Sequence, residues 1–524
     1  MPQLQFDVCV IGAGAAGGVL AATLARAGVE VVLVEGGPYR DPRLLDNHSW
    51  GYERKPRRAP PVMVDAALEP MEQRGDPVGI ARARVLGGRT THWNAVALRF
   101  SEADFQERTR AGMEDDWPIR YAELAPYYDR AERLMVISGT RENLEVLPDG
   151  HFIRPLEPRC SERILGRACG RLGLRMIPVR KAVATEPGRG RAQCHFCGHC
   201  MQGCEVSAIF NTAEHVLPAA QRTGKLKLVV NSMARQLLMG ADGLARAVSV
   251  VDRRTRREQE IRARVFALCC GNIESPRLWL NSQLANSHDV VGRYLHGHIT
   301  GQTLGYLGEL VGTRPVNQDG ATDHVYIPRF ERGRRKDYAG GFGYQLNYAS
   351  YAAPHHAKRL PGYGETFKRR VRELQPGFSM LGGFGKVVAD RRNRVTVDPA
   401  RRDAYGIPIP VVEFRWGAND RALYRDMIAT AQEIYEAAGA KLVLAPEGPP
   451  GGFASHEVGA MRMGQDPRTS VVDRYCRTHE VKNVFVTDGS CFPTFPEKNP
   501  TLTIVALALR TADGILELRR RGQI

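Results

Sequence analysis

The chain has 524 residues, of which 43% are hydrophobic and 25% charged, a composition typical of a globular protein with more than one domain. Its net charge is +16, but the basic residues are scattered and accompany no nucleic-acid-binding motif, so we expect no nucleic-acid partner. No apolar run is long enough to cross a membrane, and the chain begins directly with a strand pattern. We therefore expect neither a transmembrane segment nor an export signal in this chain.

The N-terminal residues have the pattern of a dinucleotide-binding unit. Residues 6–11 and 30–34 are apolar runs typical of buried parallel strands, and the turn Gly12-Ala13-Gly14-Ala15-Ala16-Gly17 lies between them at the start of a predicted helix. Its glycines would allow a tight turn, the approach of a pyrophosphate, and close packing of the helix on the strand. Glu35, which Gly36 follows, ends the second strand where a carboxylate can accept from ribose hydroxyls. This unit alone does not distinguish FAD from NAD.

A second glycine-rich turn occurs at residues 86–94. Gly87 and Gly88 would allow the backbone to approach a flat ring closely. Polar and aromatic residues follow, namely Thr91, His92, Trp93 and Asn94. By itself this pattern fits an ordinary loop equally well.

Four of the eleven cysteines lie close together, as Cys194, Cys197, Cys200 and Cys204. The spacing C-x2-C-x2-C-x3-C is typical of the ligands of an iron–sulfur cluster, although Glu205 stands where bacterial ferredoxins have a proline. Zinc is the alternative, bound by the four cysteines or by three of them with His195 or His199. Zinc sites usually combine two separate pairs of ligands, so the contiguous spacing favours iron and sulfur.

The middle of the chain predicts a second sheet, which is antiparallel. Residues 264–268 still have the pattern of a strand of the first sheet. His296 and His298 follow; they could reach a site, but a structural role is favoured. Apolar residues at helical spacing over 423–438 predict one long helix that ends at Gly439. The expected strands of the second sheet are residues 301–306, 339–348, 378–387 and 411–414.

The C-terminal part carries polar residues between a strand and a helix. Residues 484–487 predict a strand that ends at Asp488-Gly489-Ser490. The segment Asn499-Pro500-Thr501 precedes a predicted helix at residues 502–510, with the asparagine as N-cap and the proline at the first helical position. His456 lies upstream in a loop rich in glycine and methionine, where a lone histidine is more often structural.

Taken together, these segments resemble the glucose–methanol–choline (GMC) family of FAD oxidoreductases over nearly the whole chain, from Phe6 to about Gly514. The motifs that carry the resemblance are the N-terminal turn, Gly87-Gly88 with Thr91-His92-Trp93, Asp116-Trp117-Pro118, His456 with Arg462-Met463-Gly464, and Asp488-Gly489-Ser490 through Asn499-Pro500-Thr501. The chain looks most similar to the sugar branch, which includes pyranose oxidase, the large subunits of gluconate and fructose dehydrogenase, bacterial FAD glucose dehydrogenase and glucoside 3-dehydrogenase.

The resemblance implies an α/β fold with a Rossmann-like FAD-binding domain and a discontinuous substrate domain (α+β) built on an antiparallel sheet. It assigns residues 1–185, 213–298 and 452–524 to the FAD-binding domain. Residues 186–212 would form the iron–sulfur cysteine segment, and residues 299–451 the substrate-binding domain.

The resemblance also implies that His456 and Asn499 form the catalytic pair beside the flavin. Oxidation of an alcohol needs a group that takes the hydroxyl proton while a hydride leaves for flavin N5, and a neutral imidazole can do so. A carboxamide can hold the oxygen in place. His92 matches a histidine that binds flavin covalently in pyranose oxidase, but similar triplets bind FAD noncovalently, so both modes remain open. The implied FAD contacts are Gly12, Gly14, Ala15, Ala16, Gly17, Glu35, Gly36, Gly87, Gly88, Thr91, His92, Trp93, Asn94, Asp488, Gly489, Pro500 and Thr501.

Related sugar dehydrogenases carry a three-cysteine iron–sulfur site that Cys194, Cys200 and Cys204 match, with Cys197 additional, so a [4Fe-4S] or a [3Fe-4S] cluster is expected. The predicted function is an FAD-dependent dehydrogenase that oxidises a hydroxyl of a sugar or glycoside and passes electrons through the cluster to an external acceptor. Such enzymes often work with a small subunit and a cytochrome, which predicts a cytoplasmic protein or one exported with a signal-bearing partner to the periplasm. The alternative is an oxidase that uses dioxygen, with zinc or no metal at the cysteines.

Overall fold

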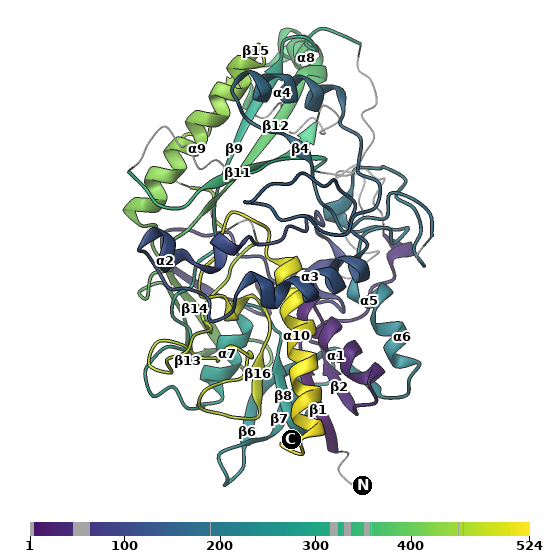
Figure 1. Cartoon of the computed structure of the whole chain (residues 1–524), viewed down its shortest axis with the longest axis vertical. Coiled ribbons are helices and arrows are strands. Elements are labelled where there is room, and N and C mark those ends of the chain that lie inside the picture. Colours follow the sequence, from purple (N-terminus) through teal and green to yellow (C-terminus); the bar gives the residue numbers. More distant parts are fainter. Residues whose placement is uncertain are drawn as a thin grey trace.

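The computed structural model describes residues 5–45, 63–188, 190–314, 323–329, 337–349, 357, 359–448, 450–453 and 455–524. Figure 1 shows a mixed α/β molecule with two main sheets, one at the end where both termini lie and one at the opposite end beside the long helix α9 (Ala418–Ala437). The predicted α/β fold class with more than one sheet is confirmed.

The sheet nearer the termini has seven strands in the order β5-β2-β1-β8-β7-β6, with β16 paired to the end of β8. The pairs β1–β2, β1–β8, β2–β5 and β8–β16 are parallel, whereas β7 is antiparallel to both of its neighbours. The predicted strands at residues 6–11, 30–34, 264–268 and 484–487 all belong to this sheet. The bounds are β1 Gln5–Ile11, β2 Val31–Val34, β5 Leu226–Val229, β6 Ser232–Met239, β7 Ala245–Asp252, β8 Glu258–Leu268 and β16 Val484–Val486.

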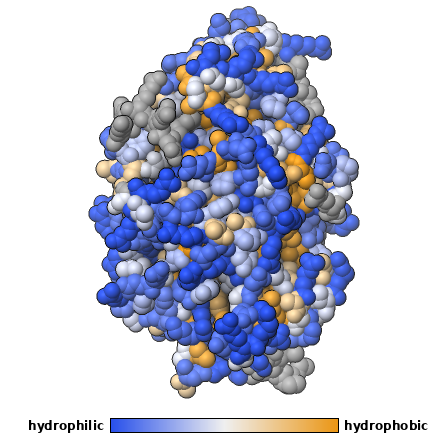
Figure 2. Space-filling view, viewed as in Figure 1, coloured by the Kyte–Doolittle hydropathy of each residue, from blue (hydrophilic) through white to orange (hydrophobic). Residues whose placement is uncertain are grey.

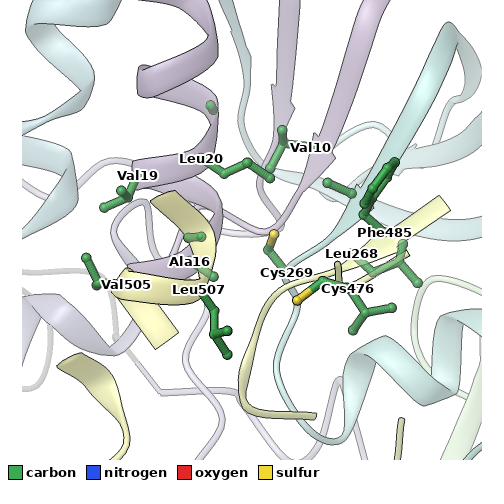
Figure 3. Packing of buried hydrophobic residues seen from close by; sticks show 14 of the residues in the cluster. Val10, Ala16, Val19, Leu20, Leu268, Cys269, Cys476, Phe485, Val505 and Leu507 are labelled. Atoms are coloured by element: carbon green, nitrogen blue, oxygen red, sulfur yellow. The ribbon is translucent and has the colours of Figure 1, made fainter. Parts of the chain in front are cut away.

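Helices from both ends of the chain pack together on this sheet. Helix α10 (Thr501–Arg520) lies between α1 (Ala15–Arg26) and α3 (Tyr121–Met135) (Figure 1). In Figure 3, the buried side chains of Val19 and Leu20 from α1 and of Val505 and Leu507 from α10 lie in one core with residues of the strands. The other helices of this half are α2 Glu107–Ala111, α5 Thr212–His215, α6 Leu217–Gln221 and α7 Glu274–Asn281.

The second sheet is antiparallel throughout, with the strand order β15-β9-β12-β11-β10-β4. Helix α9 packs against β9 and β12, and glycines in these strands bring it close: a Cβ on Gly305 would lie 2.2 Å from the ring of Tyr435, and one on Gly385 would lie 2.3 Å from Leu423. The predicted helix over 423–438 is confirmed and begins earlier than expected. The bounds are β4 Ile177–Pro178, β9 His298–Leu307, β10 Val325–Ile327, β11 Phe342–Ala349, β12 Phe378–Lys386, β15 Ala440–Leu444, α4 Cys160–Arg171 and α8 Gly364–Leu374.

One predicted strand lies in a different sheet. Residues 411–414 were expected beside β9, β11 and β12, but β14 (Pro408–Phe414) pairs with β13 (Arg394–Arg402) and β3 (Glu72–Gly75) in a separate three-stranded sheet. Alternation of apolar residues predicts a strand but not its partner, which explains the error. The 3-10 helices are η1 Pro42–Leu44, η2 Gly88–Thr91, η3 Glu102–Phe105, η4 Cys200–Gln202, η6 Gln375–Gly377 and η7 Gly489–Cys491.

The face of the molecule in Figure 2 is mainly hydrophilic, with hydrophobic residues in small separate groups. Among the described residues, no helix combines the length and apolar character that crossing a membrane requires.

Candidate active site

The glycine-rich turn after β1 has the backbone geometry that its predicted role requires. Gly12 has φ +98°, and a Cβ there would lie 2.4 Å from the carbonyl oxygen of Cys269. A Cβ on Gly17 would lie 1.8 Å from the carbonyl oxygen of Gly12, so the helix packs directly on the turn. A Cβ on Gly14 would instead meet nothing within 4 Å. Open space therefore adjoins Gly14, at the N-terminal end of α1.

This end of α1 can accept an anion. Its N-cap Gly14 has no side chain to bond the first N–H groups, and the first turn, which contains Ala15 and Ala16, has no acidic residue. Unpaired N–H groups and the helix dipole favour a phosphate at such a position. The geometry fits the pyrophosphate of a dinucleotide.

Glu35 holds the turn against the end of β2. Its carboxylate accepts from the backbone N–H of Ala13 at 3.0 Å and of Gly37 at 2.8 Å, just beyond Gly36. The side chain is only 7% exposed, and burial raises its pKa, opposed by those two hydrogen bonds and by Arg84 and Arg253. Its binding to ribose stays a prediction.

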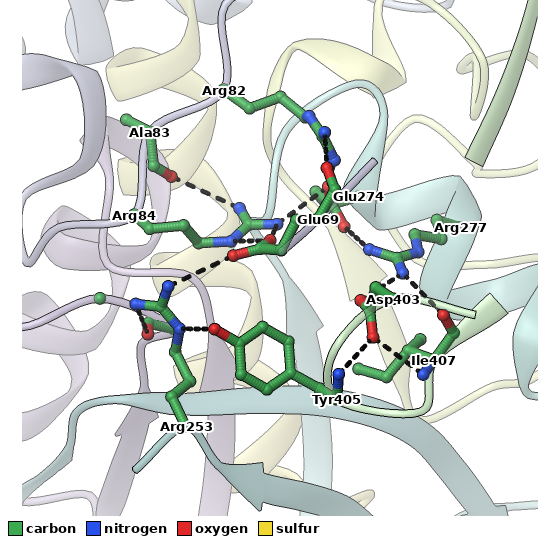
Figure 4. A network of polar contacts seen from close by, with 12 residues as sticks. Glu69, Arg82, Ala83, Arg84, Arg253, Glu274, Arg277, Asp403, Tyr405 and Ile407 are labelled. Carbon is green, nitrogen blue, oxygen red and sulfur yellow. Dashed lines mark hydrogen bonds and ion pairs between the residues drawn. The ribbon is translucent and has the colours of Figure 1, made fainter. Parts of the chain in front are cut away.

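Arg84 and Arg253 belong to a buried network of ion pairs, in which both contact Glu69 (Figure 4). The same network continues through Glu274 to Arg277 on helix α7. It therefore ties the segment around residue 84 to the first sheet and to the three-stranded sheet, beside Glu35.

The second glycine turn contacts the first one. Gly87 has φ +96°, and a Cβ on Gly88 would lie 2.9 Å from the Cα of Gly14. Thr91 Oγ1 lies 3.0 Å from His92 Nδ1, and burial, with Arg89 and Arg40, lowers the pKa of His92 to about 4. The Trp93 indole donates to the carbonyl of Phe210 at 2.9 Å, and Asn94 follows it, partly buried. The two predicted cofactor-contacting turns therefore adjoin each other.

Arg89 connects this turn to the loop that carries His456. Its guanidinium donates to the carbonyl of Ser455 and forms an ion pair of 2.7 Å with Glu457. The residues on both sides of His456 are thereby held against η2. The predicted cofactor-contacting turn and the predicted base belong to one continuous region.

The structure brings His456 and Asn499 together. His456 Nε2 lies 3.3 Å from Asn499 Nδ2, although the two residues are 43 positions apart in the sequence. Asn499 is 7% exposed, and its Oδ1 accepts from the Nε2 of buried Gln345 on β11 at 2.7 Å. The pKa of His456 is held well below 6.5, first by burial and then by His298 and Arg89. Both imidazole nitrogens of His456 thus have polar neighbours, and the ring is neutral at pH 7.

Asn499 is not the helix cap that its position predicts. Helix α10 begins at Thr501, its N-cap is Pro500, and no side chain caps it. The Asn499 carboxamide contacts Gln345 and His456 instead. Tertiary contacts overrode the local capping preference here.

The end of β16, which precedes the loop that carries Asn499, is also hydrogen-bonded to the loop that carries His456. The Asp488 carboxylate accepts from the N–H of Gly271 at 2.8 Å and from the hydroxyl of Ser275 at 2.6 Å. The carbonyl of Gly489 accepts from the N–H of Gly459 at 3.1 Å. Both residues thus stand at the carboxyl edge of the first sheet, where ligands bind in α/β folds.

His298, for which a structural role was favoured, directly contacts His456. Its Nδ1 lies 3.0 Å from the Nδ1 of His456, and its Nε2 lies 2.7 Å from the carbonyl oxygen of Pro496. The ring is fully buried and stacks on Phe495 with 4.2 Å between centroids. No local pattern distinguishes His298 from His296, so the sequence contained no signal for this contact.

The four clustered cysteines share one segment of the fold. Cys194, Cys197 and Cys204 each lie close enough to Cys200 for their thiols to interact electrostatically. Burial raises the pKa of Cys194 to about 12 and that of Cys197 to about 11. Within the described part of the chain, no three His, Cys, Asp or Glu side chains are arranged to hold a metal ion. The iron–sulfur cluster and its zinc alternative both stay predictions.

The cysteine segment adjoins the second glycine turn. Cys204 lines a pocket together with Thr90, Thr91, Arg40 and Asn211. A Cβ on the neighbouring Gly203 would lie 3.2 Å from the carbonyl oxygen of Thr91. Gly203 and Cys204 therefore lie beside the end of the turn, next to Thr91.

Comparison with known proteins agrees with this geometry. Two family models, each described as GMC oxidoreductase, match residues 6–300 and 389–508. The chain is 31% identical to 2-methyl-1,2-propanediol dehydrogenase of Mycolicibacterium austroafricanum over 98% of this chain and 95% of that protein. It is 28% identical to the fructose dehydrogenase large subunit of Gluconobacter japonicus over 99% of both chains. The crystal structure of pyridoxine 4-oxidase from Mesorbium loti has the same fold, with a TM-score of 0.68 and 19% identity over 97% of this chain and 99% of that one. The chain therefore belongs to the GMC oxidoreductases, enzymes that act on CH–OH groups and whose family implies FAD.

Proposed function

We propose that this chain is an FAD-dependent dehydrogenase that oxidises a hydroxyl group of a sugar or glycoside, with His456 as the base and Asn499 as the group that holds the hydroxyl oxygen. The observation that carries the proposal is the 3.3 Å approach of His456 Nε2 to Asn499 Nδ2. A fructose dehydrogenase subunit among the relatives supports a sugar as the substrate class.

The residues present fit FAD. The open space beside Gly14, the uncapped N-terminus of α1 and the adjoining turn at Gly88 suit a pyrophosphate, and Glu35 stands at the end of β2 where the ribose would lie. When bound, FAD supplies the acceptor for the hydride that leaves the substrate carbon. Among the other implied contacts, Pro500 and Thr501 stand at the start of α10. The adjoining turn and the strand end carry Thr91, His92, Trp93, Asn94, Asp488 and Gly489.

The pair can divide the work on a hydroxyl group. A hydroxyl placed beside both side chains would donate its proton to His456 Nε2 and accept a hydrogen bond from Asn499 Nδ2. Because the pKa of His456 lies well below 6.5, its lone pair is available at neutral pH. Asn499 cannot titrate, and Gln345 holds its oxygen, so its amino group faces His456. This arrangement orients the substrate and removes its proton.

The test of the pair is anaerobic bleaching of the flavin by a panel of sugars and glycosides. We expect His456→Ala to bind flavin normally but to lose about 10²-fold or more in the rate of bleaching, the range for loss of a general base. The matched control is His288→Ala, which removes an exposed histidine and should leave the rate unchanged. Native bleaching rates in His456→Ala would exclude His456 as the base.

We further propose that Cys194, Cys197, Cys200 and Cys204 bind an iron–sulfur cluster. Four thiols with the spacing C-x2-C-x2-C-x3-C are a suitable donor set by residue type and spacing, and this sequence pattern carries the proposal. A cluster there would supply one-electron transfer, which suits reduction of an external acceptor such as a cytochrome. Cys204 and Thr91 line the same pocket, so a cluster held there would adjoin the turn that we propose contacts the flavin.

Metal analysis of anaerobically purified protein tests the cluster. We expect iron and acid-labile sulfide, which Cys200→Ser should lose and which Cys160→Ser, at an exposed cysteine outside the segment, should keep. Zinc or no metal, together with rapid turnover with dioxygen as the acceptor, would instead identify an oxidase.

A further inference from the structure

We propose that His298 is a positioning residue that decides which ring nitrogen of His456 carries the proton, so that Nε2 of His456 is the free base. The inference rests on the proposed function, because it assigns a task to the base named there. It adds His298, which begins strand β9 of the second sheet and contacts His456 from there.

The first step is the tautomer of His298. Its Nε2 lies 2.7 Å from the carbonyl oxygen of Pro496. A carbonyl oxygen only accepts, so this nitrogen must carry a hydrogen. Full burial lowers the pKa of His298 to about 4, so the ring is neutral at pH 7 and has one N–H only. The Nδ1 of His298 is therefore an acceptor.

The tautomer of His298 in turn fixes the tautomer of His456. The two Nδ1 atoms are 3.0 Å apart, and a hydrogen bond between them needs one donor and one acceptor. Because His298 accepts, His456 must donate from Nδ1. His456 is also neutral, so its Nε2 keeps the lone pair.

Asn499, on the other side of His456, requires the same tautomer of His456. Gln345 Nε2 donates to Asn499 Oδ1 at 2.7 Å, which leaves the Asn499 amino group facing His456 Nε2 at 3.3 Å. An amino group donates, so it requires the same lone pair that the first two steps assign. The constraints from Pro496 and from Gln345 therefore meet at His456 without conflict.

Packing keeps His298 in this orientation. Its ring stacks on Phe495 at an interplanar angle of 11° and meets Phe384 edge-on with 5.6 Å between centroids. A purely structural histidine would also be packed in this way. The distinguishing property of His298 is the acceptor that it presents to His456.

Two substitutions separate packing from hydrogen bonding. His298→Phe keeps an aromatic ring against Phe495 and removes the acceptor. His298→Asn removes the ring but places an amide oxygen where Nδ1 stands, so it can still accept from His456. If His298 is merely structural, His298→Phe should disturb the enzyme less than His298→Asn. If His298 positions the proton of His456, His298→Phe should disturb His456 more than His298→Asn.

The experiment is ¹⁵N NMR of the FAD-loaded enzyme labelled at histidine, with His456 assigned from the spectrum of His456→Ala. In the native enzyme we expect the Nδ1–H form of His456. We expect the same form in His298→Asn. In His298→Phe we expect the Nε2–H form to predominate, because a buried Nδ1–H facing an apolar ring without an acceptor costs more than the loss of the single long 3.3 Å contact with Asn499. Anaerobic flavin bleaching should fall about 10²-fold in His298→Phe and much less in His298→Asn, as expected for loss of the correct tautomer.

The native spectrum alone can overturn the inference, so the proposal does not depend on how well a variant folds. An Nε2–H form of His456 in the native enzyme, or an Nδ1–H form with native bleaching in His298→Phe, would exclude it. Loss of the proposed function is a separate result: His456→Ala would then bleach normally, whatever the tautomer of His456.

Discussion

Replacement of Lys498 by methionine should destabilise the loop that carries Asn499. Lys498 is 1% exposed, and its Nζ lies 2.8 Å from Asp104 Oδ2 and 3.0 Å from Glu497 Oε1. Arg329 contacts the same two carboxylates, at 2.5 and 2.7 Å, which makes a buried group of two positive and two negative charges. Methionine fills a similar volume but leaves two buried carboxylates with one guanidinium.

The size of the effect follows from this imbalance. Removal of one partner from a buried ion pair costs about 3–5 kcal/mol. The entropy of unfolding is about 2.1 cal/mol/K per residue, or about 1.1 kcal/mol/K for 524 residues that unfold as one unit. The melting temperature of Lys498→Met should therefore fall by about 3–4.5 °C at pH 7.

The loss of stability in Lys498→Met should be smaller at low pH. Burial raises the pKa of Asp104, but Lys498 and Arg329 outweigh it and hold that pKa below its ordinary value. In the native protein this contributes stability above the unfolded pKa that is lost as the pH falls through the folded pKa. In Lys498→Met, one cation fewer raises the carboxyl pKa values, and the first proton taken up relieves the excess negative charge.

Thermal melting of the FAD-loaded enzyme at pH 7 and pH 5 checks this reasoning. The matched control is Lys368→Met on α8, which removes an exposed lysine and should shift the melting temperature by less than about 0.5 °C, since such surface changes cost at most about 0.5 kcal/mol. Equal shifts in the two variants, or a larger deficit of Lys498→Met at pH 5 than at pH 7, would refute the charge-imbalance argument.

Two further predictions concern the glycine-rich turn after β1 and the proposed base His456. Gly14→Ala should fold normally, because its Cβ enters open space, but it should bind FAD weakly, because that space is the proposed pyrophosphate site. Gly17→Ala should fail to fold normally, because its Cβ would lie 1.8 Å from a backbone oxygen. Melting and flavin content of both purified proteins check this, and full flavin content in Gly14→Ala would contradict it. Because burial, His298 and Arg89 hold the pKa of His456 well below 6.5, the rate of flavin bleaching should persist on the acid side until the pH is well below 6.5; an acid limb near 6.5 or above in the pH profile would contradict it.

Much of the fold was predictable because its signals are local. A strand, a glycine turn and a helix in succession specify the turn at Gly12, and the structure has the positive φ and the close backbone contact that only glycine permits there. The long helix α9 was equally visible from its spacing. The partner of β14 was not, because alternation along a strand is the same in either sheet.

The candidate site was predictable only in part, for a related reason. His456 and Asn499 were assigned through the family resemblance that the motifs around them carry, but a local rule assigned Asn499 to a helix cap that the structure does not have. The contacts that matter to both side chains come from strands of the second sheet: His298 begins β9, and Gln345 lies within β11.

These two strands both pair with β12, His298 opposite Lys386 and Gln345 opposite Gly382. The sheet thus fixes the spacing between the group that constrains His456 and the group that constrains Asn499, while the loops after β15 and β16 supply the pair itself. A residue held between two sheets can be influenced from the second sheet without any change in the glycine-rich turn after β1. Substitutions at His298 or Gln345 should accordingly alter the rate of proton removal, whereas flavin binding, which we propose to depend on Gly14 and the end of β2, should stay intact.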